Sequence, residues 1–174
     1  MNTPFRTNMM ITPVPFRPDA EHMRLYRNAL GQFATGVTVV TTMTDQGPTG
    51  MTVNSFTSVS LTPPLVLWCL SDRSHRYDLF CNAQTYVLNV LHSGQYDLAM
   101  AFAKDGGHFT EDNSEIGALG VPVLRDALAS FECRLHETVP AGDHSIILGQ
   151  VAHLRYRDGD PLVFHGGHFG TFAG

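Results

Sequence analysis

Two long β-type segments in the last third of the chain constrain its fold more than any other feature. They cover Ala129–Val139 and Ser145–Arg157, and only the turn Pro140–Asp143 lies between them. A connection this short joins antiparallel strands. Five shorter β-type segments accompany them: Val37–Met43, Thr49–Asn54, Leu65–Leu70, Thr85–Leu91 and Pro161–His165. Because strands and helices do not alternate as they do in a parallel sheet, the sequence predicts a mainly β fold, a closed or split β-barrel of six or seven strands.

A helix is predicted ahead of the first strand. It begins at Asp19, whose carboxylate can cap the first turn, and it ends near Gly36. Its apolar side chains recur at helical spacing and form one face: Met23, Tyr26, Leu30 and Phe33.

Two further short helices are predicted at the edge of the barrel. Ser74 can cap the first of them, which runs to Asn82, and the second covers Gln95–Ala103. The polar segment 104–115 contains two adjacent glycines and is predicted to be a mobile loop.

The chain length of 174 residues suits one domain with a full hydrophobic core. We expect this domain to cover residues 19–174. Residues 1–18 contain four prolines and no continuous apolar stretch, so they are predicted to form an extended arm and not a signal peptide.

Charge and hydropathy argue against several partners. The formal net charge is −5 and Lys and Arg do not cluster, so neither nucleic acid nor an anionic membrane is expected to bind. No apolar run approaches the roughly 20 residues that span a bilayer.

The three cysteines are widely spaced, and Cys69 and Cys133 lie in apolar runs, as buried thiols do. A reducing, cytoplasmic location is therefore expected.

The spacing of the nine histidines argues against a metal site. His165 and His168 are separated by two glycines, and neither His-Glu-x-x-His nor Cys-x-x-Cys occurs. The Gly-x-Ser-x-Gly motif of serine hydrolases, the P-loop and the Rossmann glycine pattern are also missing. A nicotinamide cofactor, if one is used, must therefore bind without a Rossmann domain.

Small hydroxyl and amide side chains gather in the segment Gly50–Pro64. Such side chains do not build a hydrophobic core alone, but they can line a groove for a flat, acceptor-rich ligand such as an isoalloxazine ring. A polar β-hairpin edge explains the same pattern equally well.

Two short polar motifs follow predicted strands. The segment Asp72–His75 opens a predicted helix, so Arg73 and free backbone N–H groups can form an anion site there. A solvated helix cap is the alternative. The turn Gly142–His144 exposes a histidine, either as a ligand contact or as an ordinary turn residue.

Taken together, these segments resemble the short-chain flavin reductases, the reductase components of two-component flavin-dependent monooxygenases. The resemblance extends from about Tyr26 to Phe169. Its strongest stretches are Arg27–Thr42, Gly50–Ser60, Pro64–Leu67, Ala141–His144 and Leu148–Val151. Separated motifs in the same order are far more specific than any one of them.

The resemblance implies a split β-barrel of the Greek-key, FMN-binding type that binds FMN or FAD and forms a homodimer. The residues that it assigns to the flavin are Thr52, Val53, Asn54, Ser55, Phe56, Ser58, Val59, Arg73, Ser74, His75, Phe102 and Ala103. Those that it assigns to the nicotinamide nucleotide are His144, Gly167, His168, Phe169 and Gly170. The chain departs from the family in two places. In the phosphate segment, Arg73 and His75 stand where lysines are common in the family. In the closing segment, His168 and Phe169 stand where Lys or Arg followed by Tyr is frequent.

The function implied by the resemblance is that of an NAD(P)H:flavin oxidoreductase, which supplies reduced flavin to a separate oxygenase. Two alternatives remain open: a flavin-containing reductase of another bound acceptor, such as a corrinoid or a metal complex, and a non-enzymatic flavin-binding module. The sequence does not choose between FMN and FAD. No Arg or Lys near His144 is placed to recognise a 2′-phosphate, which favours NADH over NADPH.

Overall fold

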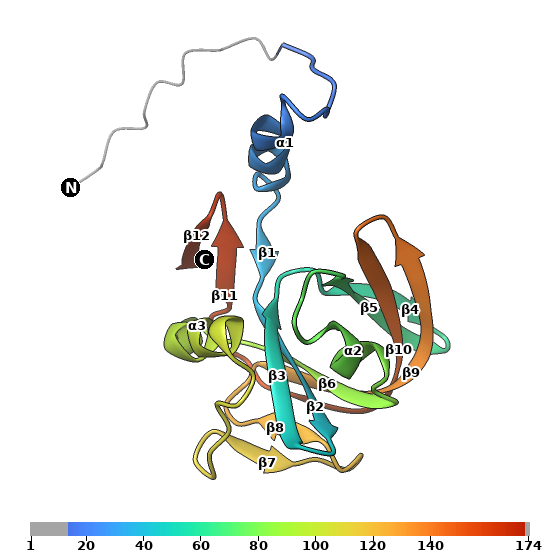
Figure 1. The fold of residues 1–174 in the computed structure, drawn as a ribbon. Helices are drawn as coiled ribbons and strands as arrows, with labels where there is room; N and C mark the ends of the chain where they lie inside the picture. The colour runs from blue at the N-terminus through green and yellow to red at the C-terminus, as the bar shows by residue number, and fades with distance from the viewer. Residues whose placement is uncertain (1–13, 173–174) are drawn as a thin grey trace, which may run out of the picture.

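The computed structural model describes residues 14–172, and these residues form a mainly β fold, as predicted (Figure 1). The principal sheet has seven antiparallel strands. In spatial order they are β3 (Gly47–Val53), β2 (Thr38–Thr44), β6 (Thr85–Val90), β9 (Ala129–Ala141), β10 (His144–Tyr156), β5 (Pro64–Ser71) and β4 (Thr57–Leu61). The sheet curls, and α2 (Tyr77–Cys81) lies between its β3 side and its β5–β10 side.

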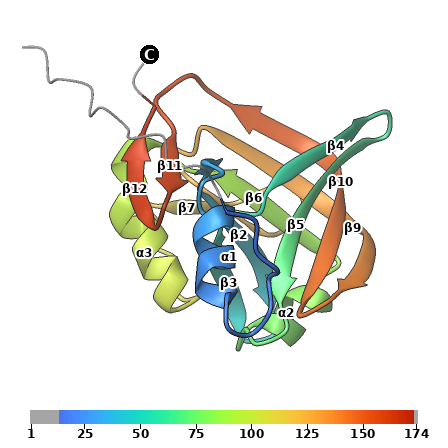
Figure 2. The ribbon, with the colours of Figure 1, turned by 90° about the horizontal axis from the view of Figure 1, so that it is seen from above.

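Two smaller sheets complete the fold. One pairs β1 (Thr35–Gly36) with β11 (Leu162–His165), which in turn pairs with β12 (His168–Thr171). The other is the hairpin of β7 (Ser114–Ile116) and β8 (Pro122–Leu124). Both views of the ribbon place the β11–β12 hairpin beside α3 (Tyr96–Lys104), away from β4 (Figure 2).

All seven predicted β segments are strands, with ends shifted by at most two residues. The sequence prediction missed β1, β4, β7, β8 and β12, so the count of six or seven strands was too low. The loop predicted over 104–115 ends at Ser114, where β7 begins, and Asn113 holds it by donating from Nδ2 to the His108 carbonyl at 2.8 Å.

The first helix is shorter than predicted. It covers Met23–Leu30, because the Asp19 carboxylate caps a turn ahead of it by accepting from the His22 N–H at 3.2 Å. Beyond Leu30 the chain extends into β1, so Gly36 lies in a strand and does not end a helix. The helix buries none of its residues and stands clear of the barrel (Figure 1).

The second helix also begins later than predicted. It covers Tyr77–Cys81, and Ser74 is not its N-cap residue. The Ser74 hydroxyl accepts instead from the Arg76 N–H at 3.2 Å, within the turn that precedes the helix. The arm predicted over residues 1–18 lies mostly outside the described residues, and residues 14–18 form neither helix nor strand.

Two hydrophobic clusters meet at β2. Val40 belongs to the cluster inside the barrel, with Trp68 and Tyr86, whereas Val39 belongs to the cluster under α3, with Phe102. Neighbouring residues of a strand face opposite sides of the sheet, so β2 is buried on both faces. This burial explains the continuous apolar and Thr-rich run of β2, which carries no charged side chain.

The buried amide of Asn89 ties the β7–β8 hairpin to the barrel. Its Nδ2 donates to the Val39 carbonyl at 3.0 Å, and its Oδ1 accepts from the Leu124 N–H and the Ser130 hydroxyl, both at 3.0 Å. A fully buried amide whose donor and acceptor are both satisfied fixes the position of its neighbours. Among residues 14–172 there is no helix of the length and apolarity needed to cross a bilayer.

Candidate functional site

A groove with two compartments surrounds the end of β3. One compartment of about 170 Å³ lies between Thr52–Asn54 and the side chains of Val37, Phe164 and Phe169. The other, of about 230 Å³, has the same Thr52–Asn54 segment as one wall. Its remaining lining residues are Met51, Ser55, Cys69, Ser71, Ser74 and His144.

The backbone that follows β3 offers hydrogen-bond donors to this groove. The strand ends at Val53 and β4 begins at Thr57, so the intervening residues belong to no ladder. Within the described part of the chain, no acceptor is bound by the backbone N–H groups of Ser55 and Phe56. The Asn54 side chain is exposed and makes no hydrogen bond to residues 14–172. These groups are therefore free to bind a ligand.

Two of the predicted ligand hydroxyls bind the protein itself. The Thr52 hydroxyl donates to the Ala99 carbonyl of α3 at 2.6 Å. The Ser55 hydroxyl donates to the Cys69 carbonyl at 3.2 Å and accepts from the Cys69 N–H at 2.9 Å. Both side chains therefore fix the end of β3 against its neighbours. Neither hydroxyl has a hydrogen left to donate to a ligand, but Thr52 keeps two lone pairs and Ser55 keeps one.

The predicted anion segment forms a turn beside the second compartment. Arg73 and His75 are exposed, and Ser74 lines the compartment. Ser74 and the segment Met51–Ser55 are some twenty residues apart in the sequence, but in the structure they line the same compartment. Arg73 belongs to this turn, where its charge can reach an anionic group of a ligand.

His144 lies in the second compartment, directly across from the start of this turn. It pairs with Ser71 in the β5–β10 ladder, and its Nδ1 lies 2.8 Å from Asp143 Oδ1. That hydrogen bond and the charge of His144 hold the pKa of the Asp143 carboxyl below its usual range. An ionised carboxylate can only accept, so Nδ1 carries the hydrogen, and in the neutral form of the ring Nε2 is an acceptor.

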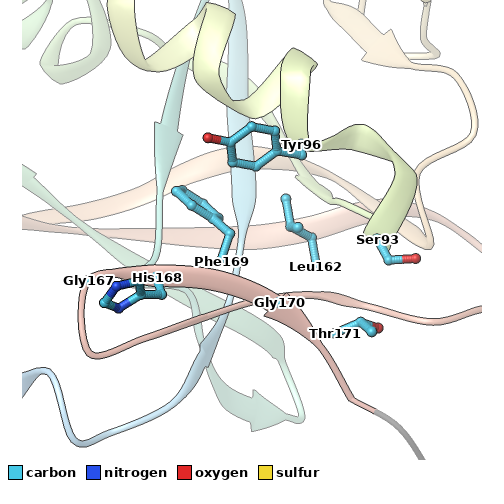
Figure 3. A pocket seen from close by; sticks show the side chains of 8 residues that line it. All are labelled: Ser93, Tyr96, Leu162, Gly167, His168, Phe169, Gly170 and Thr171. Carbon is cyan, nitrogen blue, oxygen red and sulfur yellow. The ribbon is translucent and has the colours of Figure 1, made fainter.

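The closing segment lies on the other side of Thr52–Asn54. Phe169 packs against Phe164 and Tyr96, with ring centroids 5.0 Å and 5.2 Å apart, and it forms the wall of the first compartment. Gly167, His168 and Gly170 line an outer cavity of about 510 Å³ beside Tyr96, on which Phe169 also borders (Figure 3). Of the predicted nicotinamide contacts, then, only His144 and Phe169 reach the groove, and they do so from opposite sides.

Five other predicted residues line neither compartment, among them Phe56, whose ring packs against Phe131 with centroids 5.3 Å apart. The Phe102 side chain is fully buried, with its ring behind Gly50, and Ala103 is exposed at the end of α3. Ser58 and Val59 are exposed on the edge strand β4. Their roles in flavin binding stay predictions.

Several lining residues escaped the sequence prediction. Cys69 and Ser71 alternate along β5 with buried Trp68 and Leu70, so the period of two already placed them on one face. Burial raises the pKa of the Cys69 thiol, which therefore stays protonated in the groove at neutral pH. No group of three side chains able to hold a metal ion is found among residues 14–172.

Comparison with known proteins identifies relatives over almost the whole chain. Residues 30–173 match the family model described as "Flavin reductase like domain". An FMN reductase (NADH) of Agrobacterium fabrum, SmoA, is 51% identical over 158 residues, which is 91% of each chain. The reductase component of a 4-nitrophenol 4-monooxygenase/4-nitrocatechol 2-monooxygenase of Rhodococcus opacus is 35% identical and covers 85% of this chain and 80% of its own.

A solved structure has the same architecture. The NADH:FAD oxidoreductase of Streptomyces globisporus, in complex with NAD and FAD fragments, superposes with a TM-score of 0.80 at 37% identity. The match covers 89% of this chain and 95% of that one. The predicted split-barrel fold is thereby confirmed.

Proposed function

The chain belongs to the flavin reductase-like domain family, and on that premise we propose that it is an NADH-dependent flavin reductase, an oxidoreductase that transfers a hydride from NADH to FMN or FAD. The observation that carries this proposal is the pair of compartments that meet at Thr52–Asn54. The first is a mostly apolar slot beside an aromatic wall, and the second adds several hydroxyl side chains and an imidazole to an otherwise apolar lining. This combination suits a planar ring with polar edges and a polar tail.

The residues of the groove offer the kinds of contact that a flavin needs. The free N–H groups of Ser55 and Phe56 and the amide of Asn54 can bind the polar edge of the ring. Arg73 and Ser74 lie where a phosphate can be held. When bound, the flavin accepts the two electrons and the hydride, so the protein needs to supply position and electrostatic support rather than an acid–base pair.

His144 and Phe169 are the groups that we assign to the nicotinamide nucleotide. The aromatic ring of Phe169 offers a flat surface, and the free Nε2 of His144 can accept from a carboxamide or a ribose hydroxyl. Neither compartment is lined by Lys or Arg, which would bind the 2′-phosphate of NADPH. The groove therefore favours NADH.

The reduced flavin is proposed to leave for a separate oxygenase component. The relative from Rhodococcus opacus is the reductase component of such a pair. We also propose a cytoplasmic location, because Cys69, Cys81 and Cys133 are all free thiols, as is usual in a reducing compartment.

Anaerobic stopped-flow mixing with NADH tests the proposed activity. Bleaching of the flavin absorbance over many turnovers of added free FMN or FAD is expected. If the flavin bleaches only once per protein, the chain is a reductase with a resident flavin that serves another acceptor. If it does not bleach, the chain only binds flavin.

A homodimer is the first structural prediction. The helix α1 exposes Met23, Leu25, Tyr26 and Leu30 on the described surface, each by 39–58%, and packs none of them against the barrel. Apolar faces of this kind are covered in oligomers, and a second copy supplies a self-complementary cover. Sedimentation at micromolar concentration should give twice the chain mass, and a monomer would contradict the prediction. The matched variant Leu30→Glu should shift the equilibrium towards the monomer.

Asn54→Leu is expected to weaken flavin binding by about 1–3 kcal/mol, because a polar contact to the ring is lost while a similar volume is kept. Fluorescence-quenching titration measures the dissociation constant. Asn82→Leu, at the exposed end of α2, is the matched control and should leave it unchanged. Equal affinity of the Asn54 variant and the wild type would show that Asn54 is only a turn residue.

His144→Ala should raise KM for NADH by about 2- to 10-fold, the effect of one lost hydrogen bond, and leave flavin affinity nearly unchanged. Asp143→Asn should raise KM less, because it removes the carboxylate that fixes the ring tautomer but keeps the ring. Steady-state kinetics and flavin titration of both variants separate the roles. A weaker flavin affinity with an unchanged KM would assign His144 to the flavin instead.

A further inference from the structure

Arg76 directly follows the predicted phosphate segment, but its side chain points into the protein. Its Nη1 donates to the Gly50 carbonyl at 2.7 Å and to the Phe102 carbonyl at 2.9 Å, and its Nη2 donates to the Ala103 carbonyl at 3.3 Å. One guanidinium thus connects the start of α2 with β3 and with the end of α3.

The three acceptors are well matched to a cation. Phe102 and Ala103 lie in the last turn of α3, where backbone carbonyls lack an intrahelical donor and carry the negative end of the helix dipole. Hydrogen bonds from a charged donor are about twice as strong as neutral ones. Burial lowers the pKa of Arg76, while the charge of Asp105 opposes that shift, so the guanidinium stays charged.

These contacts set the separation between two parts of the groove. The wall Met51–Ser55 follows Gly50 in β3, and Ser74 lies two residues before Arg76. The Ser74 hydroxyl accepts from the Arg76 N–H at 3.2 Å and lies 3.5 Å from Met51 Sδ. The backbone and the side chain of Arg76 therefore hold the turn Arg73–His75 against the β3 wall.

We propose that Arg76 is a positioning residue, which holds the Arg73–His75 turn at the distance from Thr52–Asn54 that lets the phosphate and the ring of one flavin bind together. The inference rests on the proposed function, since it takes the groove to be the flavin site. The ring and the phosphate are joined by a short ribityl chain. The binding free energies of the ring and of the phosphate therefore add up only if the two subsites are held at the separation that the ribityl chain can span.

Lysine cannot replace this arginine. A guanidinium presents a rigid fork of donors and reaches carbonyls of two elements at once, whereas an ammonium is a single point. Arg76→Lys keeps the charge and should lose the fixed separation. Arg76→Gln removes both. Arg73→Gln is the matched control in the same turn, because Arg73 is exposed and its side chain makes no hydrogen bond within the described residues.

The experiment measures dissociation constants for FMN and riboflavin by fluorescence quenching at low and high salt. The ratio of the riboflavin constant to the FMN constant reports the phosphate advantage. Arg73→Gln should lower this ratio and its salt dependence. Both Arg76 variants should lower the ratio about tenfold, which is the size of effect expected when one charge-assisted contact is misplaced. Because Arg73 is still present in these variants, the ratio that remains should still depend on salt. Riboflavin affinity should change much less.

A double variant, Arg73→Gln with Arg76→Gln, separates positioning from mere stability. If Arg76 acts through the turn, the double variant should lose little more of the ratio than Arg73→Gln alone. An equal weakening of FMN and riboflavin in the Arg76 variants, or factors that multiply in the double variant, would overturn the inference. If Arg76→Gln does not fold, the same ratio is measured for Arg76→Lys, alone and combined with Arg73→Gln.

Failure of the proposed function has a different signature. A wild type that binds neither flavin, or does not reduce FMN with NADH, would contradict the function itself. A wild type that reduces FMN while Arg73→Gln keeps the full phosphate advantage would show that the phosphate binds elsewhere, which overturns only the role of Arg76.

Discussion

Phe102→Ala should lower the free energy of unfolding by about 3–5 kcal/mol, as truncation of a fully buried phenylalanine does. The Phe102 ring fills the space behind Gly50, where even an added Cβ would lie 2.7 Å from it, and it packs against Phe109 with centroids 5.0 Å apart. The cavity left by alanine would lie directly under the strand that forms the groove wall. Urea unfolding followed by far-UV circular dichroism measures the loss.

Phe102→Leu decides whether the same ring also touches the flavin. Leucine keeps much of the buried volume, so the loss of stability should be less than half that of the alanine variant. Because the side chain is fully buried, flavin affinity of the folded leucine variant should equal that of the wild type. A strong loss of affinity with little loss of stability would mean that the ring contacts the ligand.

Gly149→Ala is the second substitution with a large expected effect. A Cβ at this position would lie 2.2 Å from the Tyr86 hydroxyl and 2.9 Å from Cys133 Cβ. Both neighbours are fully buried, so neither can move aside. Overpacking of this kind costs about 1–3 kcal/mol, which urea unfolding would reveal as a lower midpoint at an unchanged slope.

Tyr86→Phe should partly rescue that variant. The Tyr86 hydroxyl is buried, has no hydrogen-bond partner among the described residues, and its pKa is raised by burial. The Trp68 Nε1–H is likewise buried without a partner among these residues, so removing the hydroxyl breaks no hydrogen bond, and Tyr86→Phe alone should be close to neutral. In the double variant Gly149→Ala with Tyr86→Phe the nearest clash is gone, so its free energy of unfolding should be higher than that of Gly149→Ala alone. Simple additivity of the two changes would contradict this packing account.

The long strands could be predicted because their side chains repeat over many residues. Large apolar side chains alternate along Thr85–Val90, as in a strand. The segments that form β9 and β10 are long, rich in β-type residues and separated only by a short turn. In contrast, β8 is Pro122–Leu124 and β1 is Thr35–Gly36, too short for any period to be visible. Such strands form because distant partners bind them: Leu124 donates to the buried Asn89 side chain, and Val37, next to β1, donates to the Leu162 carbonyl at 3.1 Å.

The groove could be predicted only in part for the same reason. The segment Thr52–Ser55 was recognisable from its small polar side chains, and the resemblance to a family indicated His144. Which side of the groove each residue occupies depends on pairings such as His144 with Ser71, which join parts of the chain more than seventy residues apart. The inward direction of Arg76 likewise depends on carbonyls of β3 and α3, and nothing in its neighbouring residues indicates it.

The strand β12 has a consequence for the release of product. Among residues 14–172 it is an edge strand with one neighbour, paired to β11 through four residues, and its Phe169 is the aromatic wall of the groove. The opposite wall, at the end of β3, belongs to the seven-stranded sheet. Breaking a short edge ladder requires far less free energy than unfolding a barrel, so the two walls belong to units of different local stability. Although Phe169 also packs against the cluster under α3, we expect the groove to open by a local fluctuation of β12 while the barrel remains folded, which would let a reduced flavin leave.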